Sequence, residues 1–195
     1  QATGFKRVGA TAVAMNEARC EELRRRKDVA LGQGIRVQSL SIDELQAQWP
    51  LLNPDGILEA IHFPDDGQTN SIDTTMAIAK GARMAGAKIF ENTEVIRVII
   101  ENETAVGVET EQGIIRADNV VNCTGIWGQS FATASNTQLP IQHNQHFYIV
   151  SDPIPELTQK LTDPTPVLRI YDEQAYYKED AGKLMIGFAE LNGMP

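Results

Sequence analysis

Gly32, Gln33 and Gly34 form the segment of this sequence that comes nearest to a phosphate-binding motif. A glycine-rich loop binds a dinucleotide pyrophosphate when it follows a strand and opens a helix, because the backbone can then approach the phosphates closely. Here the two glycines follow a predicted helix, and the third glycine of the motif is absent. We therefore interpret the segment as the end of a helix.

His143 and His146 are the imidazole pair whose spacing could suggest a metal site. A strand would place residues three apart on opposite faces, and no cluster of carboxylates or thiols accompanies the pair. We therefore expect no metal site. Nucleophilic catalysis is not supported either, because no serine lies in a nucleophile-elbow pattern and neither Cys20 nor Cys123 has a histidine nearby in the sequence.

The balance of charges favours small molecules or proteins as partners. The 195-residue chain has a formal net charge of −9, and both nucleic acids and anionic membrane surfaces repel an acidic protein. No apolar run is long enough to span a membrane. Cys20 and Cys123 are the only cysteines, and the lack of a disulfide framework favours the cytoplasm, with the mitochondrial matrix as the alternative.

Caps and apolar spacing predict three helices in the first half of the chain. Asn16 is a candidate N-cap for a helix that stops at the glycines of residues 32–34, and Ser41 with Glu44 has the spacing of a capping box. Ser71 is predicted to cap a third helix. Strands are predicted around these helices at residues 5–8, 11–15, 35–40 and 57–63.

The second half of the chain is predicted to be mostly sheet. Three β-rich runs separated by turn residues, at 95–100, 105–109 and 114–117, are typical of an antiparallel meander. Residues 119–123 are almost wholly apolar and predict a strand buried on both faces. Further strands are predicted at residues 145–150, 167–171, 176–178 and 184–189. The fold class is therefore α+β, with mixed and antiparallel sheet.

The order of several segments along the chain resembles the order found in a known protein family. They include residues 5–14, 40–45, 49–52, 62–68, 71–85, 94–98, 107–110, 167–169, 176–179 and 186–190, together with Val120-Val121-Asn122-Cys123-Thr124-Gly125-Ile126-Trp127 and Gln145-His146-Phe147-Tyr148-Ile149-Val150. In this order they resemble the flavin-dependent amine oxidoreductases of the D-amino-acid-oxidase superfamily. The likeness is greatest to the dimethylglycine and sarcosine dehydrogenase branch, and it spans essentially the whole chain.

The resemblance implies a division of labour along the chain. Residues 1–58 and 131–195 would be portions of a substrate domain, and residues 59–130 would be part of an FAD-binding domain. Members of the family open with a glycine-rich loop that holds the FAD pyrophosphate, and no such loop is found here. We therefore expect a fragment of a longer flavoprotein, one that binds FAD poorly and is inactive by itself.

Five residues are implied to lie beside the cofactor in the complete protein. Val95 matches the position where the family's backbone meets the adenine side of FAD. Cys123, Thr124 and Gly125 match the segment that passes the flavin, where a glycine permits close backbone approach. Trp127 follows that turn and is expected to pack beside the cofactor, the alternative being a core aromatic.

Four residues are implied to lie on the substrate side. Tyr148 and His146 match a strand where a phenol and an imidazole could bind a carboxylate or adjust the protonation of an amine. Arg169 is the expected carboxylate clamp, since its guanidinium binds carboxylates with two hydrogen bonds; the alternative is a structural ion pair. Tyr177 is a further pocket candidate. Phe147 stands where relatives often have a polar residue, which leaves the substrate open.

The function implied is oxidation of the C–N bond of a small amino acid, such as sarcosine or dimethylglycine, by FAD. The resulting iminium would hydrolyse or pass its carbon to folate. Two alternatives remain open: a non-catalytic relative, such as a protein resembling the regulatory subunit of pyruvate dehydrogenase phosphatase, or a free-standing module that binds a small molecule. An unpaired strand at Val120 and Val121 would also favour self-association of the fragment.

Overall fold

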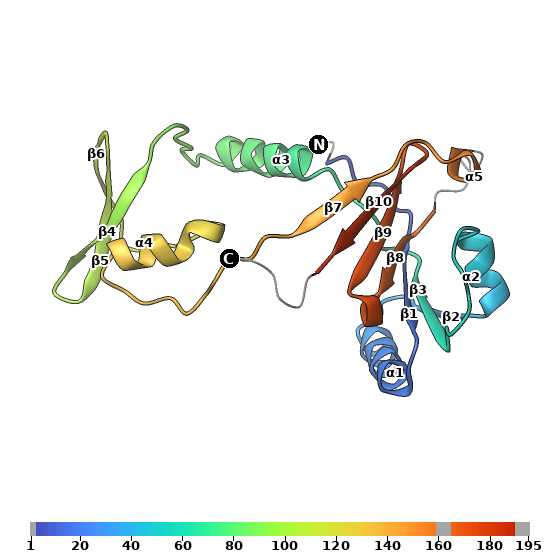
Figure 1. The fold of residues 1–195 in the computed structure, drawn as a ribbon. Coiled ribbons are helices and arrows are strands. Elements are labelled where there is room, and N and C mark those ends of the chain that lie inside the picture. Colours follow the sequence, from blue (N-terminus) through green and yellow to red (C-terminus); the bar gives the residue numbers. More distant parts are fainter. Residues whose placement is uncertain (1–2, 159–164, 190–195) are drawn as a thin grey trace. The chain divides into compact units, whose positions relative to one another are not determined.

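The computed structural model describes residues 3–158 and 165–189, and Figure 1 shows the course of the chain. The described residues form two units. The first contains residues 3–80, 146–158 and 165–189, and the second contains residues 81–145. Mixed sheet in the first unit and antiparallel sheet in the second confirm the predicted fold class. Their assignment to substrate and FAD binding stays a prediction.

The first unit is built on a seven-stranded sheet in which β1 is an inner strand, between β3 and β8. Small and β-branched residues allow β1 to be covered on both faces, and Val13 and Ala14 are fully buried. Strand β1 pairs in parallel with β8, and all other pairs are antiparallel. The strands lie in the order β2 (Gln38–Leu40), β3 (Glu59–Phe63), β1 (Ala10–Ala14), β8 (Val167–Ile170), β9 (Ala175–Asp180), β10 (Lys183–Phe188) and β7 (Phe147–Val150).

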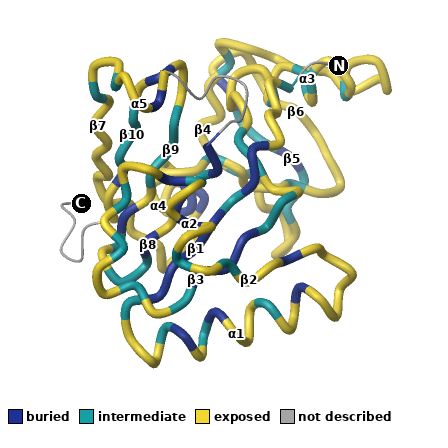
Figure 2. The backbone as a smooth tube through the Cα atoms, turned by 90° about the vertical axis from the view of Figure 1, so that its right-hand side faces the viewer, coloured by how far each residue is buried: buried dark blue, intermediate teal, exposed yellow. Residues whose placement is uncertain are grey.

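Helix α1 (Glu17–Gly32) covers one face of β1 and β3. As predicted, Asn16 is its N-cap and accepts a hydrogen bond from the backbone N–H of Arg19 at 2.9 Å. Cys20 and Leu23 belong to one buried cluster with Ala12 and other residues of the sheet. Figure 2 shows buried and exposed segments alternating along α1. Burial raises the pKa of the Cys20 thiol, so this cysteine is a core residue rather than a nucleophile.

Helix α2 (Ile42–Gln48) belongs to the opposite face of the sheet. The predicted capping box is present, because Ser41 Oγ accepts from the N–H of Glu44 and the Glu44 carboxylate accepts from the N–H of Ser41. Leu45 and Trp49 pack there with Val13 and residues of β8. A helix of only two turns is marginal alone, so its cap and this packing together stabilise it.

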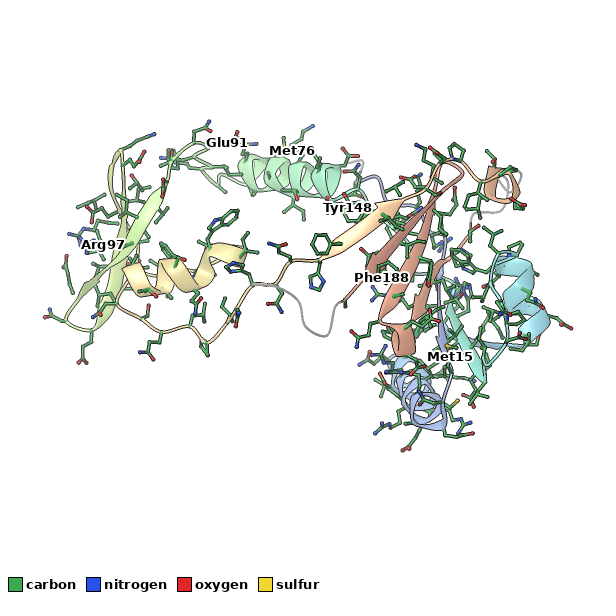
Figure 3. The ribbon with its side chains drawn as sticks, viewed as in Figure 1. Met15, Met76, Glu91, Arg97, Tyr148 and Phe188 are labelled. Atoms are coloured by element: carbon green, nitrogen blue, oxygen red, sulfur yellow. The ribbon has the colours of Figure 1, made fainter. Side chains whose placement is uncertain are left out.

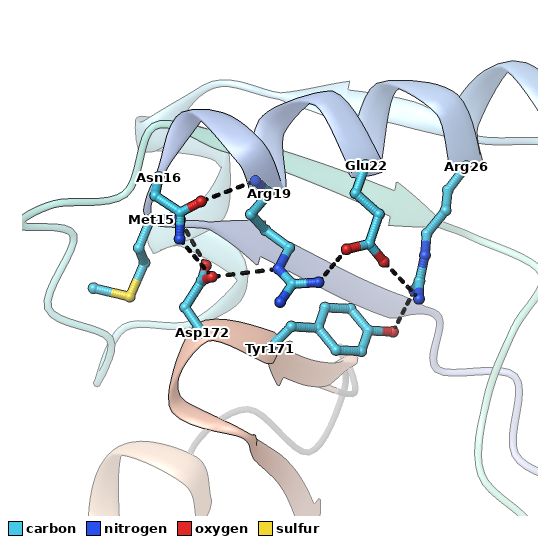
Figure 4. A network of polar contacts seen from close by, with 7 residues as sticks. All are labelled: Met15, Asn16, Arg19, Glu22, Arg26, Tyr171 and Asp172. Carbon is cyan, nitrogen blue, oxygen red and sulfur yellow. Dashed lines mark hydrogen bonds and ion pairs between the residues drawn. The ribbon is translucent and has the colours of Figure 1, made fainter.

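Asp172 ties the start of α1 to the short helix η2 (Tyr171–Glu173), which follows β8. Its carboxylate accepts hydrogen bonds from Met15 N–H at 3.0 Å, Asn16 Nδ2 at 2.7 Å and Arg19 Nε at 3.3 Å (Figure 4). Arg26 stacks on the ring of Tyr171 and donates to its hydroxyl at 2.7 Å. Helix α1 is thereby joined to the hairpin of β8 and β9.

Replacing Asp172 by asparagine is expected to lower the free energy of unfolding by about 1.5–3 kcal/mol, because hydrogen bonds to a charged acceptor are lost. Burial raises the pKa of Asp172, but the hydrogen bonds from Met15, Arg19 and Asn16 outweigh burial, so the pKa lies below its ordinary value. The contribution is therefore complete above the unfolded-state pKa of about 3.9 and is lost as the pH falls through the folded-state pKa.

Urea unfolding at neutral pH and near pH 3 measures this difference. The matched control is Asp152→Asn, an exposed carboxylate outside the Asp172 contacts. Equal stability losses for the two variants, or a loss for Asp172→Asn that does not shrink in acid, would contradict the assignment.

The second unit contains the predicted meander of β4 (Val95–Glu101), β5 (Thr104–Thr110) and β6 (Gly113–Arg116). Asn102 and Glu103 both have positive φ angles, as a tight two-residue hairpin turn requires. The short helix η1 (Gly125–Trp127) leads into α4 (Gly128–Ala134), which packs on β4. Ser135 Oγ then accepts from Val98 N–H at 3.0 Å and joins the helix to the sheet.

Three local predictions are corrected. Asn70, not Ser71, caps α3 (Ser71–Met84), because its side chain accepts from the N–H groups of Ile72 and Asp73. Residues 5–8 form only an isolated bridge between Lys6 and Gln68. The strand predicted at residues 119–123 is not formed: no described strand pairs with it, so its backbone lacks the hydrogen bonds that a strand needs.

The remaining observations on the fold concern the exposed segment at Val121, the short helix α5 and the lengths of the helices. Because no strand forms at Val120 and Val121, the sheet edge expected there is not present, and Val121 is 81% exposed. Self-association of the fragment stays a prediction. The short helix α5 (Pro155–Thr158) follows β7. In the part of the chain that the structure describes, no helix has the length and apolar character needed to cross a membrane.

Candidate functional site

Arg169 and Tyr148 lie in one row of residues that crosses strands β8, β9, β10 and β7 of the seven-stranded sheet. Arg169 on β8 is opposite Tyr176 on β9, Tyr176 is opposite Gly187 on β10, and Gly187 is opposite Tyr148 on β7. Directly opposite residues project from the same face of a sheet. We call these four residues the cross-strand row. It presents a guanidinium and two phenols on one face.

The charged and polar groups of this row are accessible. Arg169 is exposed, and among the described residues it has no ion-pair partner. The exposed fractions of Tyr148 and Tyr176 are 60% and 37%. Figure 3 shows Tyr148 on the edge strand β7, beside the strand that ends at Phe188. An exposed guanidinium on the same face of the sheet as two phenol hydroxyls can bind a carboxylate.

His146 lies one residue before β7, at the same end of the row. Its Nδ1 atom is 3.4 Å from the backbone oxygen of Phe188, the residue after Gly187. The side chain is exposed. This contact brings His146 next to β10. Its role stays a prediction.

Gly187 makes room for Tyr176. A β-carbon at position 187 would overlap the Cζ and Oη atoms of the Tyr176 ring. The phenol therefore lies over the glycine, between Arg169 and Tyr148 in the row. Sequence reasoning did not select Tyr176, and its register shows that it belongs with these two residues.

Gly187→Ala is expected to lower the free energy of unfolding by about 1–3 kcal/mol, because the Tyr176 ring must leave its position. Thermal unfolding by circular dichroism measures the change. Gly32→Ala is the matched control, since a β-carbon there meets nothing within 4 Å. A Gly187→Ala protein as stable as the control would show that the ring moves at no cost.

Tyr177 lies on the other face of the sheet. It is opposite Leu168, whose side chain is buried with Trp49 and Val13. Its hydroxyl donates to Glu173 Oε2 at 3.3 Å, and burial, followed by the charge of Glu173, raises its pKa. The structure therefore separates Tyr177 from Arg169 and Tyr148, with which it was predicted to share a pocket.

In the second unit, four of the five residues expected at the cofactor line one groove. Val95, Cys123, Thr124 and Trp127 surround a volume of about 650 Å³, together with Glu94, Ile96, Ser130, Phe131 and Ala134. Strand β4 supplies one wall, and residues 123–134 supply the other. Gly125 lies in a neighbouring depression with Ile126, Gln129, Ile141, Gln142 and His143.

The groove has the character of a site for a flat aromatic group. Trp127, on the wall of the groove, is 68% exposed, and Ile126, in the neighbouring depression, is 60% exposed. Gly125 has a φ of 59°, in the left-handed region, so a side chain there would strain the turn. These residues fit a dinucleotide with aromatic ends better than they fit a metal. Among the described residues, no three His, Cys, Asp or Glu side chains are grouped to hold one.

A family comparison then decides the class of protein. The family model described as FAD dependent oxidoreductase matches residues 1–194. The chain belongs to this family. The resemblance expected from the order of its motifs is thereby confirmed.

This FAD-dependent oxidoreductase chain is similar to several characterised proteins. It is 35% identical over 191 residues to a 4-methylaminobutanoate oxidase (formaldehyde-forming) of Paenarthrobacter nicotinovorans, covering 98% of the chain and 23% of that protein. It is 29% identical to the mitochondrial regulatory subunit of pyruvate dehydrogenase phosphatase of Mus musculus, covering 99% and 22%. It is also 29% identical to the mitochondrial sarcosine dehydrogenase of Homo sapiens, covering 97% and 21%.

Solved structures show the same fold. The L-proline dehydrogenase of P. horikoshii matches with a TM-score of 0.81 and 25% identity, over 98% of this chain and 52% of that one. The chain thus spans about a fifth of the length of its curated relatives and about half of the solved structure. Its family and fold are therefore established, whereas its substrate is a matter for proposal.

Proposed function

We propose that this chain supplies the substrate-binding sheet and part of the FAD site of an enzyme that oxidises the C–N bond of a small N-methyl amino acid. The cross-strand row carries the proposal: an exposed arginine without an ion-pair partner in the described chain, on the same face of the sheet as two tyrosines. The names of the relatives supply the substrate class, because 4-methylaminobutanoate and sarcosine are both N-methyl amino acids.

Arg169 binds the substrate carboxylate in this mechanism. Its planar guanidinium can donate two parallel hydrogen bonds, which orients the substrate as well as holding it. Strands β8 and β7 are three strand spacings apart, roughly 14 Å. Tyr176 lies between them and can donate its hydroxyl to the same carboxylate.

His146 acts on the amine. A substrate amine must lose its proton before its nitrogen lone pair can assist removal of a hydride from the neighbouring carbon. We assign uptake of this proton to His146, whose Nδ1 lies 3.4 Å from the Phe188 carbonyl oxygen. The product iminium then reacts with water to give an aldehyde and the demethylated amine, or passes its carbon to folate.

The groove of the second unit would hold FAD. Trp127 and Val95 offer apolar surface to an aromatic ring of FAD, and the backbone at Cys123, Thr124 and Gly125 offers close approach. When bound, the isoalloxazine supplies the two-electron redox chemistry. The part of this chain is to bind the flavin, to orient the substrate and to take up a proton.

A regulatory role without catalysis is the second candidate. It is favoured by the identity of 29% to the pyruvate dehydrogenase phosphatase regulatory subunit, which equals the identity to sarcosine dehydrogenase. Phe147, which stands where relatives were inferred often to have a polar residue, is compatible with this role. The two candidates differ in one observable, turnover of an amine.

The deciding experiment is anaerobic reduction of the flavin in the complete protein. Sarcosine, dimethylglycine and 4-methylaminobutanoate are added in turn, and loss of the flavin absorbance is followed, with formaldehyde measured as the product in air. Reduction of the flavin by one of these compounds supports the proposed enzymatic function. Succinate and unmethylated glycine serve as the control compounds. Full flavin binding without reduction by any of them would favour the regulatory role.

We also propose a cytoplasmic location, with the mitochondrial matrix as the alternative. Cys20 is buried and Cys123 is exposed, and both are free thiols. An exposed free thiol is compatible with a reducing compartment.

A further inference from the structure

Strand β7 forms one edge of the seven-stranded sheet, and among the described residues it is paired only with β10. Figure 1 shows it beside β10 at the end of that sheet. Its four residues, Phe147, Tyr148, Ile149 and Val150, are apolar or aromatic, and each is more than half exposed. An edge strand of this kind favours pairing with another strand, because it carries neither a charge nor a proline that would prevent it.

The other edges of the described sheets have features that oppose strand addition. Strand β2, at the opposite end of the same sheet, has only three residues, two of them polar. In the three-stranded sheet, the edge strand β4 carries Arg97 and Glu101, and the edge strand β6 carries Arg116. Short edges and charged side chains both hinder pairing with a further strand. Strand β7 is therefore the edge that favours it.

The hydrogen bonds between β7 and β10 determine which backbone groups of β7 point outward. The N–H of Ser151, the residue after β7, donates to the carbonyl of Leu184 at 2.9 Å. Backbone groups alternate in direction along an antiparallel strand, so those of Ile149 are also directed at β10. The N–H and C=O groups of Tyr148 and Val150 therefore point away from β10, toward the side of β7 on which no described strand lies.

These outward groups are complementary to a second copy of themselves. When two β7 strands lie antiparallel with Ile149 opposite Ile149, Tyr148 of each copy is opposite Val150 of the other. Each such pair exchanges two hydrogen bonds, so every outward group of both strands is paired. A shift of one residue would set outward groups against inward ones. A shift of two would move one of the outward residues past the end of the other strand.

The side chains favour the same arrangement. Within its own sheet, Ile149 is opposite Ile186, which is opposite Tyr177. With Ile149 of a second copy beside it, this apolar row continues across the junction. The same register sets His146 of each copy opposite the exposed Asp152 of the other, so that an imidazole meets a carboxylate at each end. Apolar pairs and pairs of opposite charge directly across two strands are both stabilising.

We propose that two copies of this chain associate through β7 and form one continuous sheet. The partner is a second copy, because the outward backbone groups, the apolar row and the charges at its ends are each self-complementary. Val150 of the second copy then lies opposite Tyr148, at the end of the cross-strand row. The association needs neither flavin nor substrate, so it is independent of the proposed oxidation.

Sedimentation velocity of the 195-residue chain, at concentrations from about 1 to 500 μM, tests the association. We expect a monomer–dimer equilibrium in this range. Val150→Pro removes one outward N–H from each copy and leaves the hydrogen bonds to β10 in place. It should weaken the dimer roughly 5- to 150-fold, the value of two backbone hydrogen bonds. Ile149→Lys sets like charges directly opposite each other and should weaken it roughly fivefold or more.

Ile114→Lys is the matched control. Ile114 also lies on an edge strand, β6, and it is 59% exposed, the same fraction as Ile149. This variant should dimerise as the unaltered chain does. Amide hydrogen exchange followed by NMR gives a second measurement. The amides of Tyr148 and Val150 should become protected as the concentration rises through dimerisation, whereas that of Ile149, directed at β10, should be protected throughout.

Other outcomes overturn the proposal. A chain that stays monomeric over the whole range does so, as do Val150→Pro and Ile149→Lys variants that dimerise as tightly as Ile114→Lys. Protection of the Tyr148 and Val150 amides in the monomer would show that another segment of the same chain covers this edge. Ile149→Lys changes an exposed side chain, so it keeps the test decisive if Val150→Pro disturbs β7.

Discussion

Replacing Arg169 by glutamine in the complete flavoprotein is expected to lower kcat/KM for its N-methyl amino acid roughly 100-fold or more. Removing one partner of a hydrogen-bonded charge pair in a binding site costs about 2–5 kcal/mol, and 1.4 kcal/mol is a factor of ten. The carboxylate is held equally in the ground state and in the transition state. The loss should therefore appear mainly as a higher KM, with a smaller change in kcat.

Substrate pairs separate this role from a structural one. For 4-methylaminobutanoate the variant should be severely impaired, whereas for N-methylbutylamine, which has no carboxylate, wild type and variant should be equally slow. Arg25→Gln, an exposed arginine on α1, is the matched control. Arg169→Lys should recover only part of the activity, because an ammonium cannot form the two parallel hydrogen bonds. Equal losses for both amines would exclude Arg169 as the carboxylate clamp.

Trp127→Ala is expected to weaken FAD binding by about 5- to 150-fold, the range that corresponds to the 1–3 kcal/mol typical of stacking between a base and an aromatic side chain. The physical reason is that the indole is 68% exposed on the wall of the groove and has apolar surface to offer. Titration of the apoprotein with FAD, followed by flavin fluorescence, measures the affinity.

Stability supplies the control for this variant. Trp127 is exposed, so its removal should change the free energy of unfolding by no more than about 0.5 kcal/mol. Trp49→Phe, at the buried tryptophan of the other unit, should leave FAD affinity unchanged. Unaltered FAD affinity in Trp127→Ala would place the flavin elsewhere. A large loss of stability would assign Trp127 to the core, the alternative noted for a large aromatic.

The choice between Tyr176 and Tyr177 shows how far local reasoning reaches. Strands were predicted at residues 167–171 and 176–178, and a hairpin that turns at Asp172 and Glu173 between them pairs Arg169 with Tyr176, as the structure shows. The signal that identifies Tyr176 was therefore present in the sequence. Tyr177 was selected by resemblance, and one residue of register moves a side chain to the other face.

The sequence by itself determined the features that depend on near neighbours. The caps at Asn16 and Ser41 and the turn at Asn102 and Glu103 use hydrogen bonds and backbone angles set within a few residues, so their residue types were sufficient to predict them. The order of the motifs also determined the family, because it is a property of the chain alone.

Only the tertiary structure decided which distant segments meet. The parallel pairing of β1 with β8 joins residues more than 150 positions apart, and the pairing of β10 with β7 sets Tyr148 beside Gly187. Residues 119–123 have the composition of a buried strand, yet they form none. A strand exists only where a partner satisfies its backbone, and the identity of that partner is a property of the whole fold rather than of the segment.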